Sequence, residues 1–280
     1  MTSAGIASVS DDRIVAFGRM CFGAGLIGIG VQHLFFSQFI PVVVPLWPSW
    51  IPEQQLCVYA VGSLLIVAGG FIVSGSKALS VAFALGVLFF LSVVLLHIPA
   101  RIMGGSFRLG GWTNAFKALT LSGGAFVVAV NLPDVVPGGG GISSAPIRVL
   151  GKLIPLGMYP LAITVIVFGV DHFLYTDFVA SLVPEWIPGH VFWTYFAGAA
   201  LVASGVGMIA RIKARLASSL LGATIFTWLI ILHIPRAFAD LYGGIGNEWT
   251  SVFEALAFSG MAFILGRTLD KHAGKSSTQS

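Results

Sequence analysis

The chain has 280 residues, of which 56% are hydrophobic and only 9% are charged. Soluble globular domains carry about a quarter charged residues, so this composition, with a mean hydropathy of +0.94, excludes a soluble enzyme, a disordered chain and a collagen-like chain. The net charge of +4 is compatible with nucleic-acid binding, but the basic residues fall mainly on one side of the membrane spans predicted below. We therefore expect a polytopic membrane protein that contacts the lipid bilayer and has no nucleic-acid partner.

Eight apolar stretches are each long enough to cross the hydrocarbon core of a bilayer as a helix, which takes about 20 residues. In chain order they cover residues 15–36, 56–74, 79–97, 112–130, 153–174, 191–210, 216–233 and 249–266. A transmembrane barrel would need strands of about ten residues with alternating polarity, whereas these stretches are continuously apolar. The sequence therefore predicts an all-α fold with eight transmembrane helices.

Lys and Arg gather on one side of these spans. Eleven of the fifteen lie near the two termini or in the loops that follow the even-numbered spans, namely Arg13, Arg19, Lys77, Arg148, Lys152, Arg211, Lys213, Arg215, Arg267, Lys271 and Lys275. The opposite side keeps Arg101, Arg108, Lys117 and Arg236, together with most of the acidic residues. The positive-inside rule places the richer side, and with it both termini, in the cytoplasm.

The second half of the sequence repeats motifs of the first half. Leu-His-Ile-Pro occurs at 96–99 and again at 232–235, and Trp-Ile-Pro occurs at 50–52 and again at 186–188. Each repeat contains four spans, an even number, so the two units have the same orientation and should be related by a pseudo-twofold axis along the membrane normal. We therefore predict two parallel four-helix bundles.

This repeat gives the predicted domain organisation. In chain order, the segments are a cytoplasmic N-terminal tail at 1–14, a first four-helix unit at 15–130, a Gly-rich cytoplasmic linker at 131–150, a second four-helix unit at 151–267 and a cytoplasmic C-terminal tail at 268–280. The linker contains four consecutive glycines at 138–141, and Gly-rich segments behave as flexible chains. We expect the linker to connect the two units without a fold of its own.

Four motifs follow one another in the second half: a His at the end of the first helix, a Trp-Ile-Pro loop, a Leu-His-x-Pro-Arg ending to the third helix and a Glu-Trp-Thr-Ser opening to the fourth. They lie at His172, Val183–Pro188, Leu232–Arg236 and Asn247–Ser251. A four-span unit with this pattern resembles DoxX-like bacterial integral membrane proteins, and the resemblance covers nearly the whole chain as two fused units. The first half departs from the pattern, with Gln32 in place of Asp171 and Asn114 in place of Ser251.

The resemblance implies a location in the cytoplasmic (inner) membrane of a bacterium. DoxX-like relatives are described as subunits of thiosulfate:quinone oxidoreductase or as partners in membrane redox complexes. The first hypothesis is therefore a subunit or accessory of a membrane redox complex that interacts with quinone and with another redox subunit, and no residue is assigned as catalytic. The alternatives are a transporter or binder of small molecules and a structural membrane scaffold.

A layer of polar side chains near the outer membrane surface is the candidate site. Because a helix rises 1.5 Å per residue, the stretch from Arg215 to His233 climbs about 27 Å and brings His233 to the outer edge of the hydrocarbon. In the second half the layer holds Asp171, His172, His233, Arg236 and Glu254, and in the first half the equivalent layer holds Gln32, His33, His97, Arg101 and Lys117. Ionisable groups at membrane depth are costly unless they pair or line a wet cavity. We therefore take the second-half layer as a ligand-binding or proton-relay site and the first-half layer as its degenerate equivalent.

We expect four of the second-half residues to converge in one outer-leaflet cavity inside their four-helix unit: His172, His233, Arg236 and Glu254. A quinone headgroup could bind there between His and Arg or Glu. The same groups could instead hold neighbouring helices together, with Arg236 and Glu254 as a structural ion pair. Two His per unit could also hold a haem or a metal ion, but no C-x-x-C-H or H-E-x-x-H motif is present. We therefore predict no metal site and favour quinone over haem.

Tryptophan side chains mark the expected outer interface of the membrane. Trp and Tyr rings form belts at the level of the lipid headgroups because they are apolar with one polar atom. We assign six tryptophans to this belt: Trp47, Trp50, Trp112, Trp186, Trp193 and Trp249.

Overall fold

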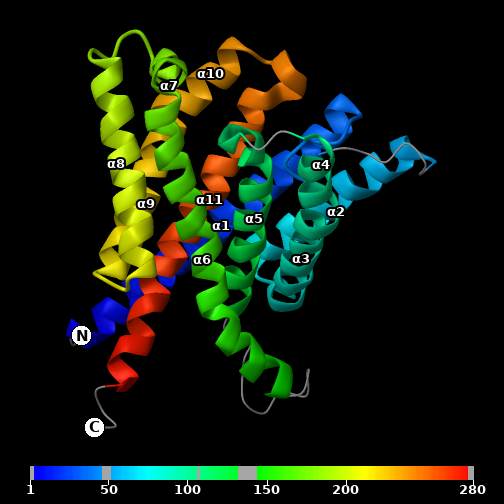
Figure 1. Cartoon of the computed structure of the whole chain (residues 1–280). Coiled ribbons are helices and arrows are strands. Elements are labelled where there is room, and N and C mark those ends of the chain that lie inside the picture. Colours follow the sequence, from blue (N-terminus) through cyan, green and yellow to red (C-terminus); the bar gives the residue numbers. More distant parts are fainter. Residues whose placement is uncertain (1–2, 46–51, 106–107, 132–143, 277–280) are drawn as a thin grey trace.

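The computed structural model describes residues 3–45, 52–105, 108–131 and 144–276, and all regular secondary structure in these ranges is helical. Eight segments are long and apolar enough to span a membrane, and Figure 1 shows their arrangement. The long helix of each span is α1 (Ser3–Phe36), α2 (Gln54–Ser74), α3 (Ala78–Ser92), α5 (Thr113–Val130), α6 (Ser144–Leu174), α8 (His190–Ile209), α9 (Ala214–Trp228) and α11 (Gly243–Ser276). The predicted all-α fold with eight transmembrane helices is confirmed, and it fits an integral membrane protein.

The third span of each half contains one π-helical turn at the same place. The elements concerned are η1 (Val93–His97) followed by α4 (Ile98–Met103), and η3 (Leu229–His233) followed by α10 (Ile234–Ala239). A proline inside a helix lacks an amide hydrogen and collides with the carbonyl four residues earlier. Pro99 and Pro235 follow these turns, and the wider π turn lets the helix pass them without ending. The spans therefore continue beyond His97 and His233, which are the last residues of the two predicted spans.

The two halves are built from matching elements. α3 and α9 have 15 residues each, and the π turns that follow them have 5 residues each. Close helix contacts also repeat: a Cβ atom at Gly62 would lie 2.9 Å from the carbonyl oxygen of Gly30, and one at Gly198 would lie 3.1 Å from that of Gly169. Glycine at these positions lets the first and second spans of each half approach backbone to backbone. The internal repeat found in the sequence is therefore also present in three dimensions.

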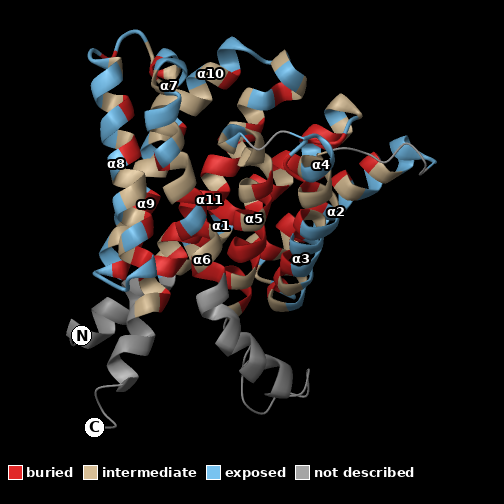
Figure 2. Cartoon of the chain, in the orientation of Figure 1, coloured by how far each residue is buried: buried red, intermediate tan, exposed pale blue. Residues whose placement is uncertain are grey.

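The fourth span of each half packs against the first span of the other half. α11 contacts α1, α5 contacts α6, and α5 and α11 lie against each other. Figure 2 shows that buried residues are concentrated in α1, α5 and α11, at the centre of the molecule. Each four-helix bundle is therefore completed by a helix of the other half.

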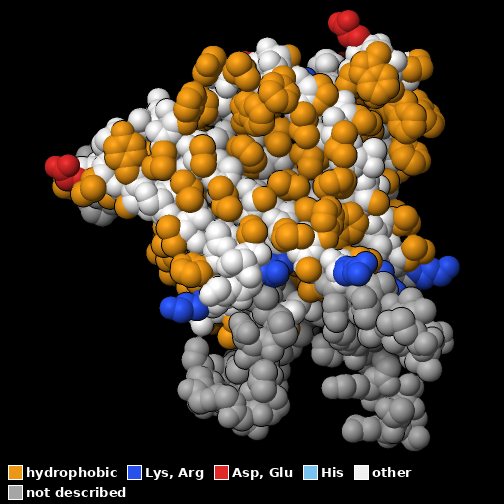
Figure 3. Space-filling model, turned by 180° about the vertical axis from the view of Figure 1, so that it is seen from behind, with side chains coloured by type: hydrophobic (Ala, Val, Ile, Leu, Met, Phe, Trp, Pro, Cys, Tyr) orange, Lys and Arg blue, Asp and Glu red, His pale blue; other side chains and the backbone are white. Residues whose placement is uncertain are grey.

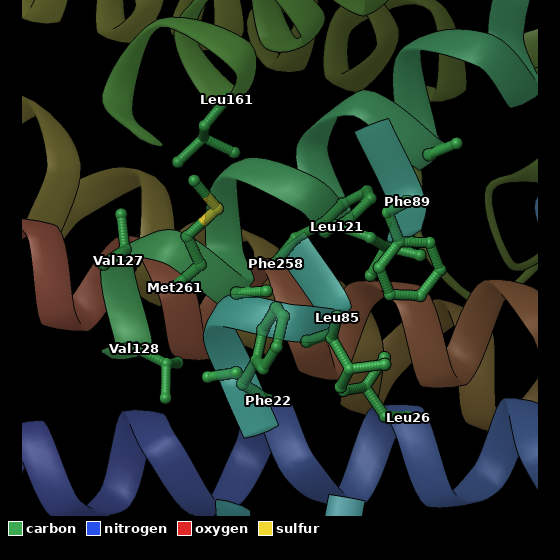
Figure 4. Close-up of a cluster of buried hydrophobic side chains, with 14 of the residues drawn as sticks. Phe22, Leu26, Leu85, Phe89, Leu121, Val127, Val128, Leu161, Phe258 and Met261 are labelled. Atoms are coloured by element: carbon green, nitrogen blue, oxygen red, sulfur yellow. The ribbon is translucent and has the colours of Figure 1, made fainter. Parts of the chain in front are cut away.

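The hydrophobic core lies where the two halves meet. Phe22 of α1 and Leu121 of α5 are fully buried in it, together with Leu161 of α6 and Met261 of α11. Figure 4 shows these side chains directed toward one another. Because both halves contribute to a single cluster, close packing of side chains joins the two halves.

The outer surface is apolar over most of its height. Figure 3 shows hydrophobic side chains over one face, with Lys and Arg side chains along one edge. Arg211, Lys213 and Arg215 are exposed at and just after the turn between α8 and α9, and the start of α1 and the end of α11 lie at the same end of the molecule as this turn (Figure 1). The predicted linker at 131–150 lies largely outside the described residues, and α6 already begins within it, at Ser144.

Candidate functional site

A cavity of about 280 Å³ lies inside the four-helix bundle of the second half. α6, α8, α9 and α11 form most of its walls, α5 contributes Lys117, and the short helix α7 (Thr176–Leu182) contributes Val179 and Leu182. Most of the lining is apolar, including Phe168, Leu201 and Phe258. Small-molecule sites measure roughly 300–1,000 Å³, so this cavity is near the lower end and suits a ligand about the size of one substituted ring.

Three of the five residues predicted for the second-half site line this cavity. His172 lies in the last turn of α6, His233 closes the π turn η3, and Glu254 lies on α11. They come from three different spans, and each span is fixed by packing against its neighbours. The helices thus present two imidazoles and one carboxylate to the same space.

Glu254 forms an ion pair with Lys117 of α5, and the distance from Nζ to Oε2 is 2.6 Å. The two side chains are only 4% and 18% exposed. Their positions correspond in the two repeats, as the alignment of Trp112 with Trp249 shows. The alternative interpretation, an ion pair of Arg236 with Glu254, is therefore not what the structure shows, because α5 packs against α11 and places Lys117 at the carboxylate.

The second carboxylate oxygen of Glu254, Oε1, is buried and has no hydrogen-bond partner among the described residues. A buried acceptor without a donor costs about 1–3 kcal/mol. Because Glu254 also lines the cavity, a water molecule or a ligand in the cavity is the partner that this oxygen requires.

The hydrogen bond that His172 makes within α6 fixes the position of its proton. Its Nδ1 atom lies 2.7 Å from the carbonyl oxygen of Phe168, and a carbonyl oxygen only accepts, so Nδ1 donates. In the neutral imidazole Nε2 is then unprotonated and can only accept a hydrogen bond. His172 thus offers an acceptor in addition to the free oxygen of Glu254.

Arg236 and Asp171 are not among the residues that line the cavity. The guanidinium of Arg236 binds both carboxylate oxygens of Glu248, with nitrogen–oxygen distances of 3.0 and 2.6 Å. Asp171 is half-buried, and its Oδ1 atom has no hydrogen-bond partner among the described residues. The structure therefore places Arg236 in a local ion pair and Asp171 beside the cavity, next to His172.

In the first half, the space between the matched histidines is filled by the chain itself. The segment Phe39–Val44, which we call the plug, follows α1, and most of its side chains are buried. The amide of Ile40 donates to Nε2 of His33 at 3.3 Å, and Nε2 of His97 donates to the carbonyl oxygen of Val42 at 3.1 Å. The hydroxyl of Ser92 donates to the carbonyl of Val43. The first-half layer is therefore occupied.

The remaining first-half residues join the halves or cover a loop. The side-chain amide of Gln32 donates to the carbonyl oxygen of Gly246 at 2.9 Å and to the hydroxyl of Thr250 at 3.1 Å, which links α1 to α11. Arg101 lies against Gly111, where a Cβ atom would collide with its guanidinium. Gly111 is the third residue of the short 3₁₀ segment η2 (Leu109–Trp112).

Sequence reasoning missed several members of the cavity. Lys117 was assigned to the first-half layer, although it lines the second-half cavity together with Thr194 and Trp228. The available signal was the opposite charge of Lys117 and Glu254 at matched positions. Trp193, expected in the interfacial belt, also lines the cavity, whereas Trp186 is 70% exposed. Trp47 and Trp50 lie outside the described residues.

Within the part of the chain that the structure describes, no group of three or more His, Cys, Asp or Glu side chains is arranged to hold a metal ion. The cavity instead combines an apolar body with a few hydrogen-bonding groups. Such a lining can orient an uncharged ring through its polar substituents.

Comparison with known proteins places a family match on the same half. Residues 161–253 match the model of a family described as a domain of unknown function, DUF8561. This stretch covers about a third of the chain, includes His172, His233 and Arg236, and ends one residue before Glu254. No curated protein and no solved structure gives a significant match to the chain. The family description assigns no activity.

Proposed function

We propose that this integral membrane protein binds a molecule of the quinone class in the second-half cavity. The observation that supports the proposal is an apolar cavity inside a membrane-spanning bundle, bordered by His172, His233 and the Lys117–Glu254 pair. A quinone or quinol is an apolar ring with two oxygens, so it needs apolar walls and hydrogen-bonding groups near the ring. A ligand that dissolves in lipid can reach such a site from the bilayer.

The aromatic lining supports the same class of ligand. Trp193 and Trp228 both line the cavity, and their rings contact each other edge to face with centroids 6.4 Å apart. Aromatic faces stack on other rings with a gain of about 0.5–1.5 kcal/mol beyond the buried area. A six-membered quinone ring fits this environment better than a flexible or strongly charged solute.

The wider role in the proposal rests on the resemblance to DoxX-like proteins. On that basis the chain acts as a subunit or accessory of a membrane redox complex in the bacterial inner membrane. The distribution of Lys and Arg supports an orientation with both termini in the cytoplasm. In this orientation the cavity lies in the outer half of the membrane, because His172 and His233 lie near the outer ends of their spans.

The proposal is tested by titrating the purified protein in detergent with decylubiquinone. Quinones quench tryptophan fluorescence, and Trp193 and Trp228 report on the cavity. We expect saturable quenching that is lost in Ala197→Phe, because Ala197 lines the cavity and a phenyl ring fills it. Ala199→Phe is the matched control, since Ala199 is exposed on the same helix.

Equal quenching in the two variants would contradict the proposal, because it would place the quinone in detergent or on the lipid-facing surface. That result would favour a structural scaffold. Organic extraction of the untreated protein gives an independent readout, and we expect a co-purified quinone to be depleted in Ala197→Phe only.

A further inference from the structure

The plug of the first half shows which hydrogen bonds the repeated histidine pair makes with a group that lies between the two rings. Ile40 presents an amide hydrogen to His33, and Val42 presents a carbonyl oxygen to His97. The plug thus supplies one donor and one acceptor on an apolar body. His33 also makes the same bond within its helix as His172 does, from Nδ1 to the carbonyl four residues earlier, at 2.8 Å.

The cavity of the second half corresponds in position to the plug of the first. His172 and His233 match His33 and His97 in the repeat. The cavity-lining residues Thr194 and Leu201 match Val58 and Leu65, which are buried in the core cluster that also contains the valines of the plug. The same helical frame therefore surrounds a peptide segment in one half and open space in the other.

The hydrogen bonds of the cavity residues show which of their atoms remain free to bind a ligand. Nε2 of neutral His172 can only accept, because Nδ1 donates to Phe168. Oε1 of Glu254 is a buried acceptor that lacks a donor among the described residues. These two acceptors need hydrogen-bond donors from whatever occupies the cavity. A quinone ring carries only carbonyl and ether oxygens, which accept, whereas a quinol carries two hydroxyl groups, which donate.

We infer that the second-half cavity selects a hydroxyl-bearing ring, and hence the quinol over the quinone. This inference rests on the proposed function and adds the oxidation state of the ligand. One hydroxyl donates to His172 or Glu254, and its oxygen or the second oxygen accepts from His233 or Lys117, as the carbonyl of Val42 accepts from His97 in the first half. A ring without a hydroxyl leaves both acceptors unpaired, which a binding site penalises strongly.

The test compares two pairs of ligands that differ only in their donors. The first pair is decylubiquinol and decylubiquinone, and the second is 4-heptylphenol and its methyl ether, which avoids redox chemistry. Dissociation constants come from tryptophan quenching or from competition with decylubiquinone, with the protein in detergent. We expect the hydroxyl-bearing member to bind at least about tenfold more tightly in both pairs. His172→Leu should reduce this preference by at least threefold, and His190→Leu, on a half-buried His at the start of α8, should not change it.

The outcomes separate this inference from the proposed function. If both members of each pair bind equally and Ala197→Phe abolishes both, the quinone-class site stands and the selection of the quinol is wrong. If none of the four ligands binds saturably, both proposals fail. The comparison in the unsubstituted protein decides the matter even if His172→Leu does not fold.

Discussion

The two halves place the same pair of histidines in the same helical frame but fill the space between them differently. In the first half the plug bonds to His33 and His97, and in the second half His172 and His233 border a cavity. The difference therefore lies in the connection between the first and second spans and not in the helices. The same arrangement of helices can thus hold a structural histidine pair in one half and a histidine pair that borders a ligand cavity in the other.

The sequences of the two connections explain this difference. The plug contains Val42, Val43 and Val44 between Pro41 and Pro45. Proline does not continue a helix interior, and the plug forms a short turn in which the amides of Val43 and Val44 donate to the carbonyl oxygen of Ile40. The corresponding stretch of the second half has Ala180 where the plug has Pro41, and it forms α7; Pro45 is matched by Pro184, which comes after that helix. A helix keeps its backbone groups bonded to itself, so they are not offered to the histidines.

The ion pair that joins the halves should give the largest effect. Glu254→Ala leaves the mostly buried ammonium of Lys117 without a partner, and breaking such a pair costs about 3–5 kcal/mol. We expect the free energy of unfolding, measured by titration of the detergent-solubilised protein with SDS, to fall by about 3 kcal/mol.

Exchanging the charges provides the control for this prediction. Because the two positions correspond in the repeat, the double variant Lys117→Glu with Glu254→Lys should recover most of the loss. A loss of less than about 1 kcal/mol in Glu254→Ala, the value typical of exposed pairs, would mean that the pair does not hold the halves together.

Removing the matched histidines should have opposite consequences in the two halves. His97→Ala deletes a buried ring and leaves the carbonyl of Val42 without its donor, so we expect a loss of about 2–3 kcal/mol in the same SDS titration. His233→Ala enlarges a cavity that already exists, so its loss should stay below about 1 kcal/mol.

Ligand binding reverses that order. His233→Ala should abolish or strongly weaken decylubiquinone quenching, and His97→Ala should change it little as long as the protein remains folded. Equal effects of the two substitutions on binding would show that the halves do not differ in the way proposed.

The residues that precede the first histidine of each pair provide a third comparison. The amide of Gln32 donates to the carbonyl of Gly246, and a carboxylate cannot donate, so Gln32→Glu should lower the free energy of unfolding by about 2 kcal/mol. Asp171→Asn should cause no loss, because Oδ1 of Asp171 has no partner among the described residues to lose. Both are measured by SDS titration, and a larger loss in Asp171→Asn would contradict the assignment of Asp171 as unpaired.

The frame of the molecule was accessible from the sequence, whereas the pairing of side chains was not. Hydrophobic length predicted the eight spans. The Leu-His-Ile-Pro repeat predicted that His97 corresponds to His233, and the match of Gln32-His33 with Asp171-His172 predicted that His33 corresponds to His172. These patterns are local or periodic, so they can be recognised in the sequence without knowing which helices contact each other. The π turns before Pro99 and Pro235 were missed, because a proline in an apolar stretch signals either an end or an adapted turn.

The partners of charged groups depend on helix packing, which the sequence does not contain. Arg236 lies 18 residues from Glu254, and the expectation of a pair used only their shared depth. In the structure Glu248, at the start of α11, lies nearer to Arg236, and α5 delivers Lys117 to Glu254. The plug was missed for a similar reason, since three valines between two prolines give no sign that the connection enters the bundle.

A small effect is also expected from the partly exposed ion pair of Arg236 with Glu248. Arg236 and Glu248 are 30% and 15% exposed, and the position of Glu248 corresponds to Gly111 in the first half. Partly exposed pairs are screened by solvent and salt and contribute about 0–1 kcal/mol. Glu248→Gln should therefore lower the free energy of unfolding by less than about 1 kcal/mol, and the difference should shrink when the SDS titration is repeated at high salt. It should leave quinone quenching unchanged, because neither side chain lines the cavity. A loss of binding in Glu248→Gln would instead make Arg236 part of the site, as its place in the polar layer first indicated. The Arg236–Glu248 ion pair could then no longer be separated from the residues that bind the ligand.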